Sequence, residues 1–472
     1  MDITVIRNLL AISQNITSDI IKDLISDHAT RHAKMYNLYE RYKATTAGVP
    51  VFSRTFDDKN KVNNKLNNDF FGDIIDTKIG YFAGKPISYG LDRNMYMPDG
   101  KTLNEQLYLK HTKQISDFNI RCNIEDLDSE TAKKAAICGY GSRLLYIDKN
   151  AMEKVIDIDP WETIFINDGS ISEAQYALRY YTISVIQNNN TVQRTRVEWY
   201  DSQNVTFYIM NDKGEYELDD MEPVNPKPHL FDDVPLICFP NNEELQGDAE
   251  KVLNLIDGYD NTLSDINSEL EQFRLAYMIF IGMDPDEDTI NAAKRTGAFG
   301  LEENCSAEFL TKTINDVIIE NHLNRLEENI LKFAKSVNFG DEAFGGTITG
   351  IAMKFKLFGL ESKCITAERK FAAALRNQYR ILSTAWLKKG ISIDYTNIFF
   401  TFKRNFPLNL LDEAQTTTQL KGNISERTRL SLLSFVDDVE YEMQLMEREN
   451  IDKVDLDDDP DNDLEDEDNE NA

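Results

Sequence analysis

The chain has 472 residues, 41% of them hydrophobic and 10% aromatic, which provides for a sizeable core and excludes a disordered protein. Its formal net charge is −30, and residues 451–472 supply about eleven of these charges, because they hold twelve Asp and Glu against Lys453 alone. The remaining body, near −19, lacks a basic footprint, which excludes a protein built to grip nucleic acid through its phosphates.

The cysteines and the hydropathy pattern indicate where the chain folds. Five cysteines are scattered without a C-x-x-C pair, and an odd number cannot pair completely within one chain, so we expect a reducing, intracellular compartment. The N-terminus lacks the pattern of a secretory leader, and no run of about 18 apolar residues occurs. We therefore expect neither secretion nor a membrane span.

The first 110 residues read mainly as helices with polar connections. Residues 15–44 carry apolar positions at helical spacing, with Asn15 and Ser18 as candidate N-caps. A second helix is predicted over 64–84, where Gly84 precedes Lys85 and Pro86. The character changes between Arg143 and Pro240, which hold the short runs RLLYID, KVIDID, ETIFIND, YALRYYTISVI, RTRVEWYD, NVTFYIMND and VPLICF. Their β-branched residues and closing turn residues predict a mostly antiparallel β region.

A heptad seam follows the β region. From Leu245 to Tyr277, apolar residues recur at alternating spacings of four and three, which predicts a helical rod of roughly 50 Å. From Glu243 to Glu271, nine carboxylates stand against Lys251 alone, and the next basic residue is Arg274. Residues 278–314 then read as strand, helix, strand, and a second helix returns with the same spacing from Ile319 to Phe333. The two helices are predicted to form a hairpin with a small α/β tip.

A glycine-rich loop and a very long helix come next. The stretch SVNFGDEAFGGTITG leads into a proline-free helix that is predicted to run from Thr349, a candidate N-cap, to Gly390, with a kink at Gly359. Residues 391–407 alternate as a strand pair or one long strand. Residues 411–450 predict two helices around a turn at Gly422, the second opened by a capping box of Asn423 and Glu426, before a disordered acidic tail.

No pattern for catalysis or for a cofactor emerges from the sequence. The glycine-rich loop lacks the Lys-Ser or Lys-Thr that a phosphate-binding loop needs, and no nucleophile motif occurs. His28 and His32 share a helix face without a third ligand, so solvated surface is the better interpretation than a metal site. Asp341 and Glu342 fit a solvated loop better than acid–base chemistry. We expect no enzyme activity, no cofactor and no metal.

The acidity of the first rod favours a particular assembly. When nine carboxylates are balanced by one basic residue along a helical segment, the carboxylates repel one another. The polar face of the helix therefore requires contact with water. If many copies pack around an axis, their apolar seams are buried between neighbours and the carboxylates form rings around a water-filled bore. Duplex DNA carries about one charge per 1.7 Å of axis, so an acidic bore would repel it from every side and let it slide.

Five stretches in this order resemble the portal proteins of long-tailed bacteriophages. They are NNDFFGDIIDTKIGYFAGKPI, NNEELQGDAEKVLNLIDGYDNTLSDINSELEQF, LTKTINDVIIENHLNRLEENILKFA, FGDEAFGGTITGIAMKFKLFGLESKCITAERKF and ISERTRLSLLSFVDDVEYEMQLMERE. The resemblance implies an α+β portal fold with an α/β wing, a long-helix stem, a small α/β clip and a helical crown, and a chain that forms a ring, usually a dodecamer, around a central channel.

Carried over segment by segment, the resemblance implies these parts: wing 1–240, stem helix 241–277, clip 278–314, second stem helix 315–336, tunnel loop 337–349, long wing helix 350–390, wing strands 391–410, crown 411–450 and acidic tail 451–472. The crown is short for the family, since only two helices precede the tail.

The same resemblance supplies candidate site residues. The tunnel loop, the narrowest element of the bore, would comprise Phe339, Gly340, Asp341, Glu342, Ala343, Phe344, Gly345 and Gly346. The channel-lining stem residues would be Asp257, Asp260, Asp265, Glu269 and Glu271. In the clip, Lys294, Arg295 and Lys312 could face partner proteins or the DNA at its exit, and surface solvation is an equal alternative for each.

The implied partners are further copies of the chain, double-stranded DNA without sequence specificity, the terminase large subunit, a head-completion adaptor, and the major capsid and scaffolding proteins. The implied location is the portal vertex of the virion, after assembly in the host cytoplasm. Two alternatives remain open at this point: a coiled-coil scaffold without a channel, and a nuclease that uses a carboxylate cluster with magnesium.

Overall fold

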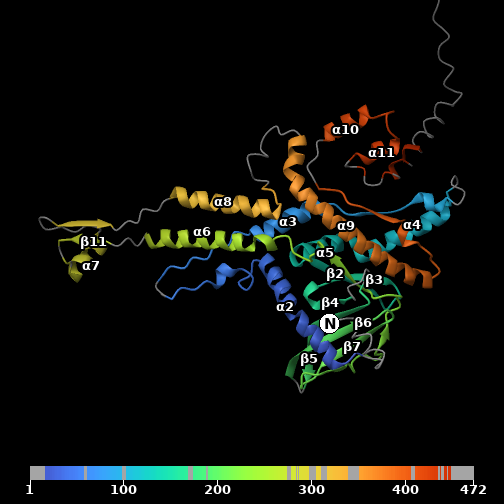
Figure 1. Ribbon diagram of the computed structural model, residues 1–472, viewed down its shortest axis with the longest axis horizontal. Coiled ribbons are helices and arrows are strands. Elements are labelled where there is room, and N and C mark those ends of the chain that lie inside the picture. Colours follow the sequence, from blue (N-terminus) through green and yellow to red (C-terminus); the bar gives the residue numbers. More distant parts are fainter. Residues whose placement is uncertain are drawn as a thin grey trace, which may run out of the picture. The chain divides into compact units, whose positions relative to one another are not determined.

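The computed structural model contains two compact units (Figure 1). The main unit comprises Met1–Ile79 and Phe118–Tyr395, and the second unit Gly80–Asp117 and Thr396–Ala472. The described residues are 16–57, 61–97, 103–167, 174–187, 190–273, 278–282, 284, 286–296, 305–309, 316–338, 350–405, 410–433, 436, 439, 441–443 and 445–447.

Helix α2 (Ser18–Tyr42) opens the described part of the main unit. Thr17 caps it, because the Thr17 hydroxyl accepts a hydrogen bond from the amide of Ile20 at 3.4 Å. The prediction of Ser18 as the cap is wrong, since its hydroxyl instead accepts from the amide of Tyr216 at 2.8 Å; Asn15 lies outside the described residues. Helix α3 (Phe70–Phe82) starts later than predicted, since residues 64–68 are extended.

The predicted antiparallel β region is confirmed. A three-stranded sheet has the order β10-β2-β3, and a second sheet runs β4-β5-β6-β7-β8 with β9 on β7. Every pairing in both sheets is antiparallel. The strands are β2 (Tyr140–Ile147), β3 (Glu153–Ile158), β4 (Thr163–Ile166), β5 (Tyr176–Gln187), β6 (Asn190–Tyr200), β7 (Asn204–Met210), β8 (Tyr216–Leu218), β9 (Lys227–Pro228) and β10 (Leu236–Pro240).

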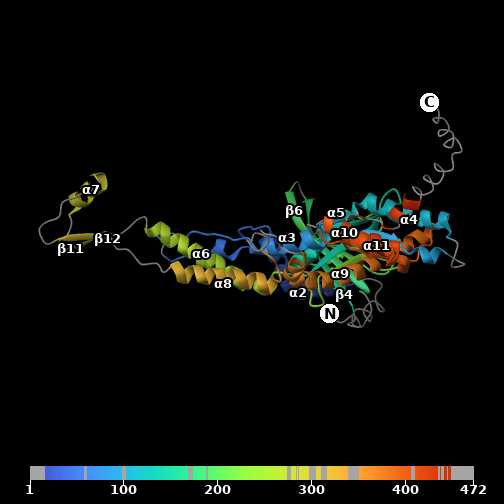
Figure 2. The same cartoon turned by 90° about the horizontal axis from the view of Figure 1, so that it is seen from above.

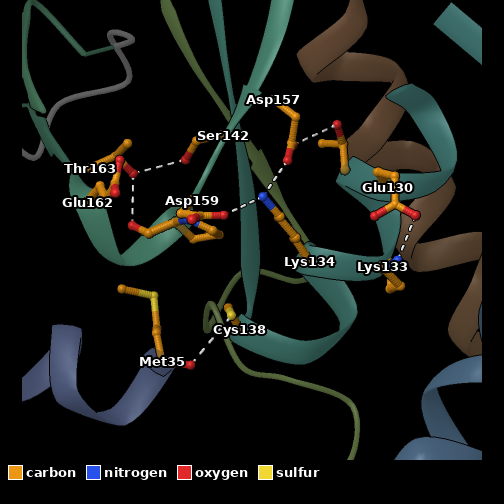
Figure 3. A network of polar contacts seen from close by, with 12 residues as sticks. Met35, Glu130, Lys133, Lys134, Cys138, Ser142, Asp157, Asp159, Glu162 and Thr163 are labelled. Carbon is orange, nitrogen blue, oxygen red and sulfur yellow. Dashed lines mark hydrogen bonds and ion pairs between the residues drawn. The ribbon is translucent and has the colours of Figure 1, made fainter. Parts of the chain in front are cut away.

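Helices cover both sheets. The apolar face of α2 packs on the larger sheet, where Ile21 meets Leu178 and Val197 in one buried cluster. Helix α5 (Ile124–Cys138) lies on the smaller sheet, and its Lys134 binds Asp157 at 2.5 Å and also Asp159 (Figure 3). Burial by itself lowers the pKa of Lys134, but the two carboxylates outweigh it and raise the pKa above its ordinary value.

The predicted helical hairpin is also present in the main unit. Helix α6 (Leu253–Phe273) and helix α8 (Asp316–Ala334) lie side by side in both views (Figures 1 and 2). Between them come β11 (Met278–Ile281), α7 (Glu287–Thr296) and β12 (Ser306–Phe309), and β11 pairs with β12, which confirms the strand, helix, strand prediction. The first rod is shorter than predicted, because Leu245 has φ +51° and a 3-10 turn, Glu250–Val252, precedes α6.

The long helix is confirmed as α9 (Gly350–Lys388), whose ribbon changes direction towards its N-terminal end (Figure 1). Gly390 follows it with φ +77°, as a helix stop requires. Thr349 lies outside the described residues. Other helices of the chain are α4 (Glu105–Cys122), η1 (Pro50–Ser53), η2 (Arg93–Tyr96), η3 (Pro160–Glu162) and η6 (Tyr395–Asn397).

The second unit differs most from the sequence-based predictions. Residues 391–405, the described part of the predicted strand region, hold one short strand, β13 (Ile398–Thr401), in place of a pair or a long strand, and it pairs with β1 (Ser88–Leu91). Helix α10 (Leu410–Gln419) and the turn at Gly422, φ +84°, agree with the prediction. Helix α11 (Glu426–Ser431) is capped by Ser425, which accepts from the amide of Thr428 at 3.3 Å, so the proposed cap at Asn423 is wrong.

Candidate functional site

The acidic face of α6 carries a ladder of polar side chains. Asp260, Ser264 and Ser268 recur every four residues, so they lie in one row along the helix, and all three are buried. Their oxygens accept from the backbone amides of Asn68, Leu66 and Asn64 at 2.8, 2.9 and 2.9 Å, in that order.

The geometry of the ladder follows from backbone dimensions. Four helical residues rise about 6 Å, and two extended residues span about 6.6 Å, so an extended segment can match alternate amides to every fourth helical side chain. Residues 64–68 therefore lie along α6 as an extended segment, which explains why they do not join α3. Burial raises the pKa of Asp260, and the amide of Asn68 partly opposes this shift.

The other predicted stem carboxylates flank this ladder. Asp257 forms an ion pair with Arg41, and Asp265 lies 2.6 Å from Arg54, whose guanidinium also donates to the carbonyl of Asn64 at 3.0 Å. Glu271 accepts from the side-chain amide of Asn64 at 2.8 Å. Asp265 and Glu271 are exposed, whereas Glu269 is half-buried and Asp260 is 1% exposed.

A buried charged cluster holds the base of α6. This α6-base cluster consists of Lys78, Asn241, Asp248 and Lys363. Lys78 donates to Asp248 and to Asn241, both at 2.6 Å, and the side chains of Lys78 and Asp248 are each 3% exposed. Lys363 lies 3.1 Å from the other carboxylate oxygen and donates to the carbonyl of Ala334 at 2.8 Å. The cluster therefore joins α3, the turn before α6, the end of α8, and α9.

The electrostatics of the cluster favour a charged aspartate. Burial alone would raise the pKa of Asp248, but Lys78 and Lys363 outweigh it and hold the pKa below its ordinary value. Burial lowers the pKa of Lys363, against the attraction of Asp248. Removing one member of such a group leaves a buried charge without a counter-charge, which lowers the free energy of unfolding.

The predicted loop and clip residues belong only in part to the described residues. The loop Phe339 to Gly346 and Lys312 lie outside the described residues, and of Lys294 only the position in α7 is described. Arg295 lies near the end of α7 and is exposed. Among the described residues, no cluster of three or more His, Cys, Asp or Glu could hold a metal ion. Within the described ranges, no helix has both the length and the apolar character needed to cross a membrane.

Comparison with known proteins gives the family. The family model described as "Phage portal protein, SPP1 Gp6-like" matches residues 21–455. The chain belongs to this family of phage portal proteins. It is 26% identical over 410 residues to the portal protein of Bacillus phage SPP1, covering 83% of this chain and 77% of that protein. It is 23% identical over 451 residues to the portal protein of Clostridium phage phiCD119, covering 89% and 93%.

For this portal-family chain, sequence reasoning missed the groups that hold the helices in place. Lys78 stands on an apolar helix and its partner Asp248 is 170 residues away, so no local pattern connects them. The sequence did contain a pattern that indicates the ladder. Asp260, Ser264 and Ser268 are short polar residues at a fixed spacing of four, which places them in one row on the helix.

Proposed function

We propose that this chain is the portal subunit of a phage capsid. Copies assemble into a closed ring, a dodecamer, at one vertex of the virion, and double-stranded DNA passes through its axial channel during packaging and ejection. The family match over residues 21–455 carries this proposal, because it spans the helical hairpin, its α/β tip and the long helix. Heterologous contacts that close on themselves generate such rings.

The proposed parts keep the boundaries predicted from the sequence: wing 1–240 and 350–410, stem 241–277 and 315–336, clip 278–314, tunnel loop 337–349 and crown 411–450. In this assignment α6 and α8 are the stem helices, and α7 with β11 and β12 belongs to the clip. The tunnel loop, Phe339 to Gly346, would narrow the bore and move with the DNA.

For the channel lining we propose Asp265, Glu269 and Glu271. Asp265 has a 61% exposed side chain, and Glu271 is exposed. Asp257 has a side chain only 28% exposed in its ion pair with Arg41, and Asp260 is 1% exposed, so the proposal leaves them out. Carboxylates along the bore would repel phosphate and prevent sequence-specific adhesion.

The proposed partners follow from this role. The ring would dock the terminase large subunit and the head-completion adaptor at the clip, near Lys294, Arg295 and Lys312, and would associate with the major capsid and scaffolding proteins during assembly in the host cytoplasm. The chain would do no catalysis itself, and a separate ATPase would supply the energy of packaging.

Complementation of a phage that lacks this chain tests the proposal. The wild-type chain should restore DNA-filled capsids. A variant with Asp265, Glu269 and Glu271 changed to Lys should yield at least tenfold fewer filled capsids, because basic side chains along the bore would bind the DNA phosphates and stop its passage. A matched control changes the exposed Glu215, Glu217 and Asp220 to Lys and should fill capsids normally. Normal filling without any copy of the chain would refute the proposed function.

A further inference from the structure

A pocket in the main unit lies apart from the stem. It has a volume of about 790 Å³ and is lined by residues of α2, the β-rich region and α9. Pockets that bind small ligands usually measure about 300 to 1,000 Å³ and combine apolar walls with a few polar groups. The apolar walls here comprise Ile164, Phe165, Val234, Leu236, Ala373, Ala374 and Ile381.

One buried polar atom of a lining residue has no hydrogen-bond partner among the described residues. His28 is 8% exposed, and its Nδ1 lies 2.9 Å from the hydroxyl of Tyr180. Its Nε2 is buried and has no hydrogen-bond partner within the described part of the chain. Since a buried polar atom without a partner costs about 1 to 3 kcal/mol, such an atom at a pocket wall indicates a place for a ligand atom.

One charged group of the pocket is also uncommitted. Arg31 lies one helical turn after His28, and its guanidinium packs over the ring of Tyr140 at 5.0 Å. Among the described residues, no carboxylate pairs with Arg31. The other cations of the lining are already bound, Arg380 to Asp233 at 2.7 Å and Lys370 to Glu243.

We infer that this pocket binds a carboxylate on an apolar stem, held by the guanidinium of Arg31 and the Nε2–H of His28. A guanidinium pairs with a carboxylate through two parallel hydrogen bonds. A single carboxylate matches the charge of the one uncommitted cation, whereas a doubly charged phosphate would leave a buried negative charge without a counter-ion. The apolar walls would cover the stem. Because burial lowers the pKa of His28 to about 4, its imidazole is neutral near pH 7 and adds a donor without a second charge.

The carboxylate has two possible sources, a free organic acid and an Asp or Glu of a second copy, and the test separates them. The probe is hexanoate, with hexanol as the stem-only comparison, titrated calorimetrically into the dissociated full-length chain. We expect hexanoate to bind and hexanol not to bind. Arg31→Ala should weaken the binding of hexanoate at least tenfold, and Arg31→Lys should weaken it less. Lys22→Ala, on the same helix but outside the pocket, should match the wild type.

The assembled form decides the source. If the assembled chain still binds hexanoate, a free acid is the ligand. If assembly blocks hexanoate and Arg31→Ala lowers the assembled fraction, a neighbouring copy supplies the carboxylate. Asp168 and Glu173 adjoin the lining residues Asn167 and Ala174 in sequence, so a variant with Asp168→Asn and Glu173→Gln is included.

Three results would overturn the inference: equal hexanoate binding by the wild type and Arg31→Ala, binding only by the variant with Asp168→Asn and Glu173→Gln, and no binding together with normal assembly of Arg31→Ala. The calorimetric arm needs no ring, so its failure would leave the proposed portal function standing.

Discussion

The Nζ of Lys363 lies 2.8 Å from the carbonyl oxygen of Ala334, so the long helix α9 holds the last residue of helix α8. The same ammonium lies 3.1 Å from Asp248 in the turn that precedes α6. One side chain thus connects the turn before α6 and the end of α8 to α9.

Lys363→Met should therefore destabilise the main unit. The change leaves the carbonyl of Ala334 without this donor and leaves Asp248 with Lys78 and the amide of Asn241, which costs about 1 to 3 kcal/mol in the free energy of unfolding. Urea unfolding measures this loss. Lys388→Met is the matched control on the same helix, where an exposed pair with Asp232 contributes about 0.5 kcal/mol or less. Equal losses in both variants would show that the α6-base cluster does not stabilise the protein.

The polar ladder predicts a local effect on hydrogen exchange. A variant with Ser264→Ala and Ser268→Ala removes the acceptors of the amides of Leu66 and Asn64, and each lost bond is worth about 1 kcal/mol. The exchange of these amides should become roughly fivefold to tenfold faster, as measured by mass spectrometry. Thr262→Ala is the control, because its hydroxyl donates to the carbonyl of Gly258 in its own helix and not to residues 61–68. Unchanged exchange over residues 61–68 would contradict the ladder.

Two glycine substitutions should have opposite effects. Gly139 has φ +94°, and a Cβ there would lie 2.1 Å from the carbonyl oxygen of Leu245, so Gly139→Ala should cost about 2 to 4 kcal/mol. Gly258 lies in α6 with open space around a Cβ, so Gly258→Ala should stabilise the chain by about 0.5 to 1 kcal/mol. Thermal unfolding measures both, and a stable Gly139→Ala variant would be inconsistent with the packed turn.

His28 should make the stability depend on pH. Burial lowers its pKa from 6.5 to about 4, so the unfolded state takes up the proton first as the pH falls. The contribution of the neutral imidazole to the free energy of unfolding is fully present above pH 6.5. It is lost between pH 6.5 and about 4, by an amount on the order of 1 to 3 kcal/mol. His28→Gln should flatten the curve of unfolding free energy against pH in this window. Parallel curves for the variant and the wild type would refute this assignment.

The sequence predicted elements where local pattern decides structure. The β-branched runs from Arg143 to Pro240 correspond to strands, and the helical spacing from Ile319 to Phe333 corresponds to α8, because each buries a face that its own residues define. The family resemblance, which rests on several such segments in order, was confirmed for residues 21–455.

Long-range contacts account for what the sequence did not predict. Strand β1 pairs with β13 across some 300 residues, and residues 64–68 are extended because α6 binds their amides, so neither feature has a local cause. The heptad pattern overestimated the length of the first helix. Leu245 fits the apolar spacing, but it has φ +51° and its amide donates to the carbonyl of Asn242 in a turn. The N-caps of α2 and α11 were predicted at the wrong residues. Thr17 and Ser425 have neighbouring polar residues with a similar propensity for the N-cap position, so the sequence does not distinguish them.

The mass and axial view of the purified chain test the central claim most directly. One chain weighs 54.2 kDa, so a ring of twelve weighs about 650 kDa. Mass photometry with averaged electron-microscope images should give particles near this mass with an open centre viewed down the axis. A particle of one or two chains at every concentration, without a central opening, would contradict the portal account and favour a coiled-coil scaffold.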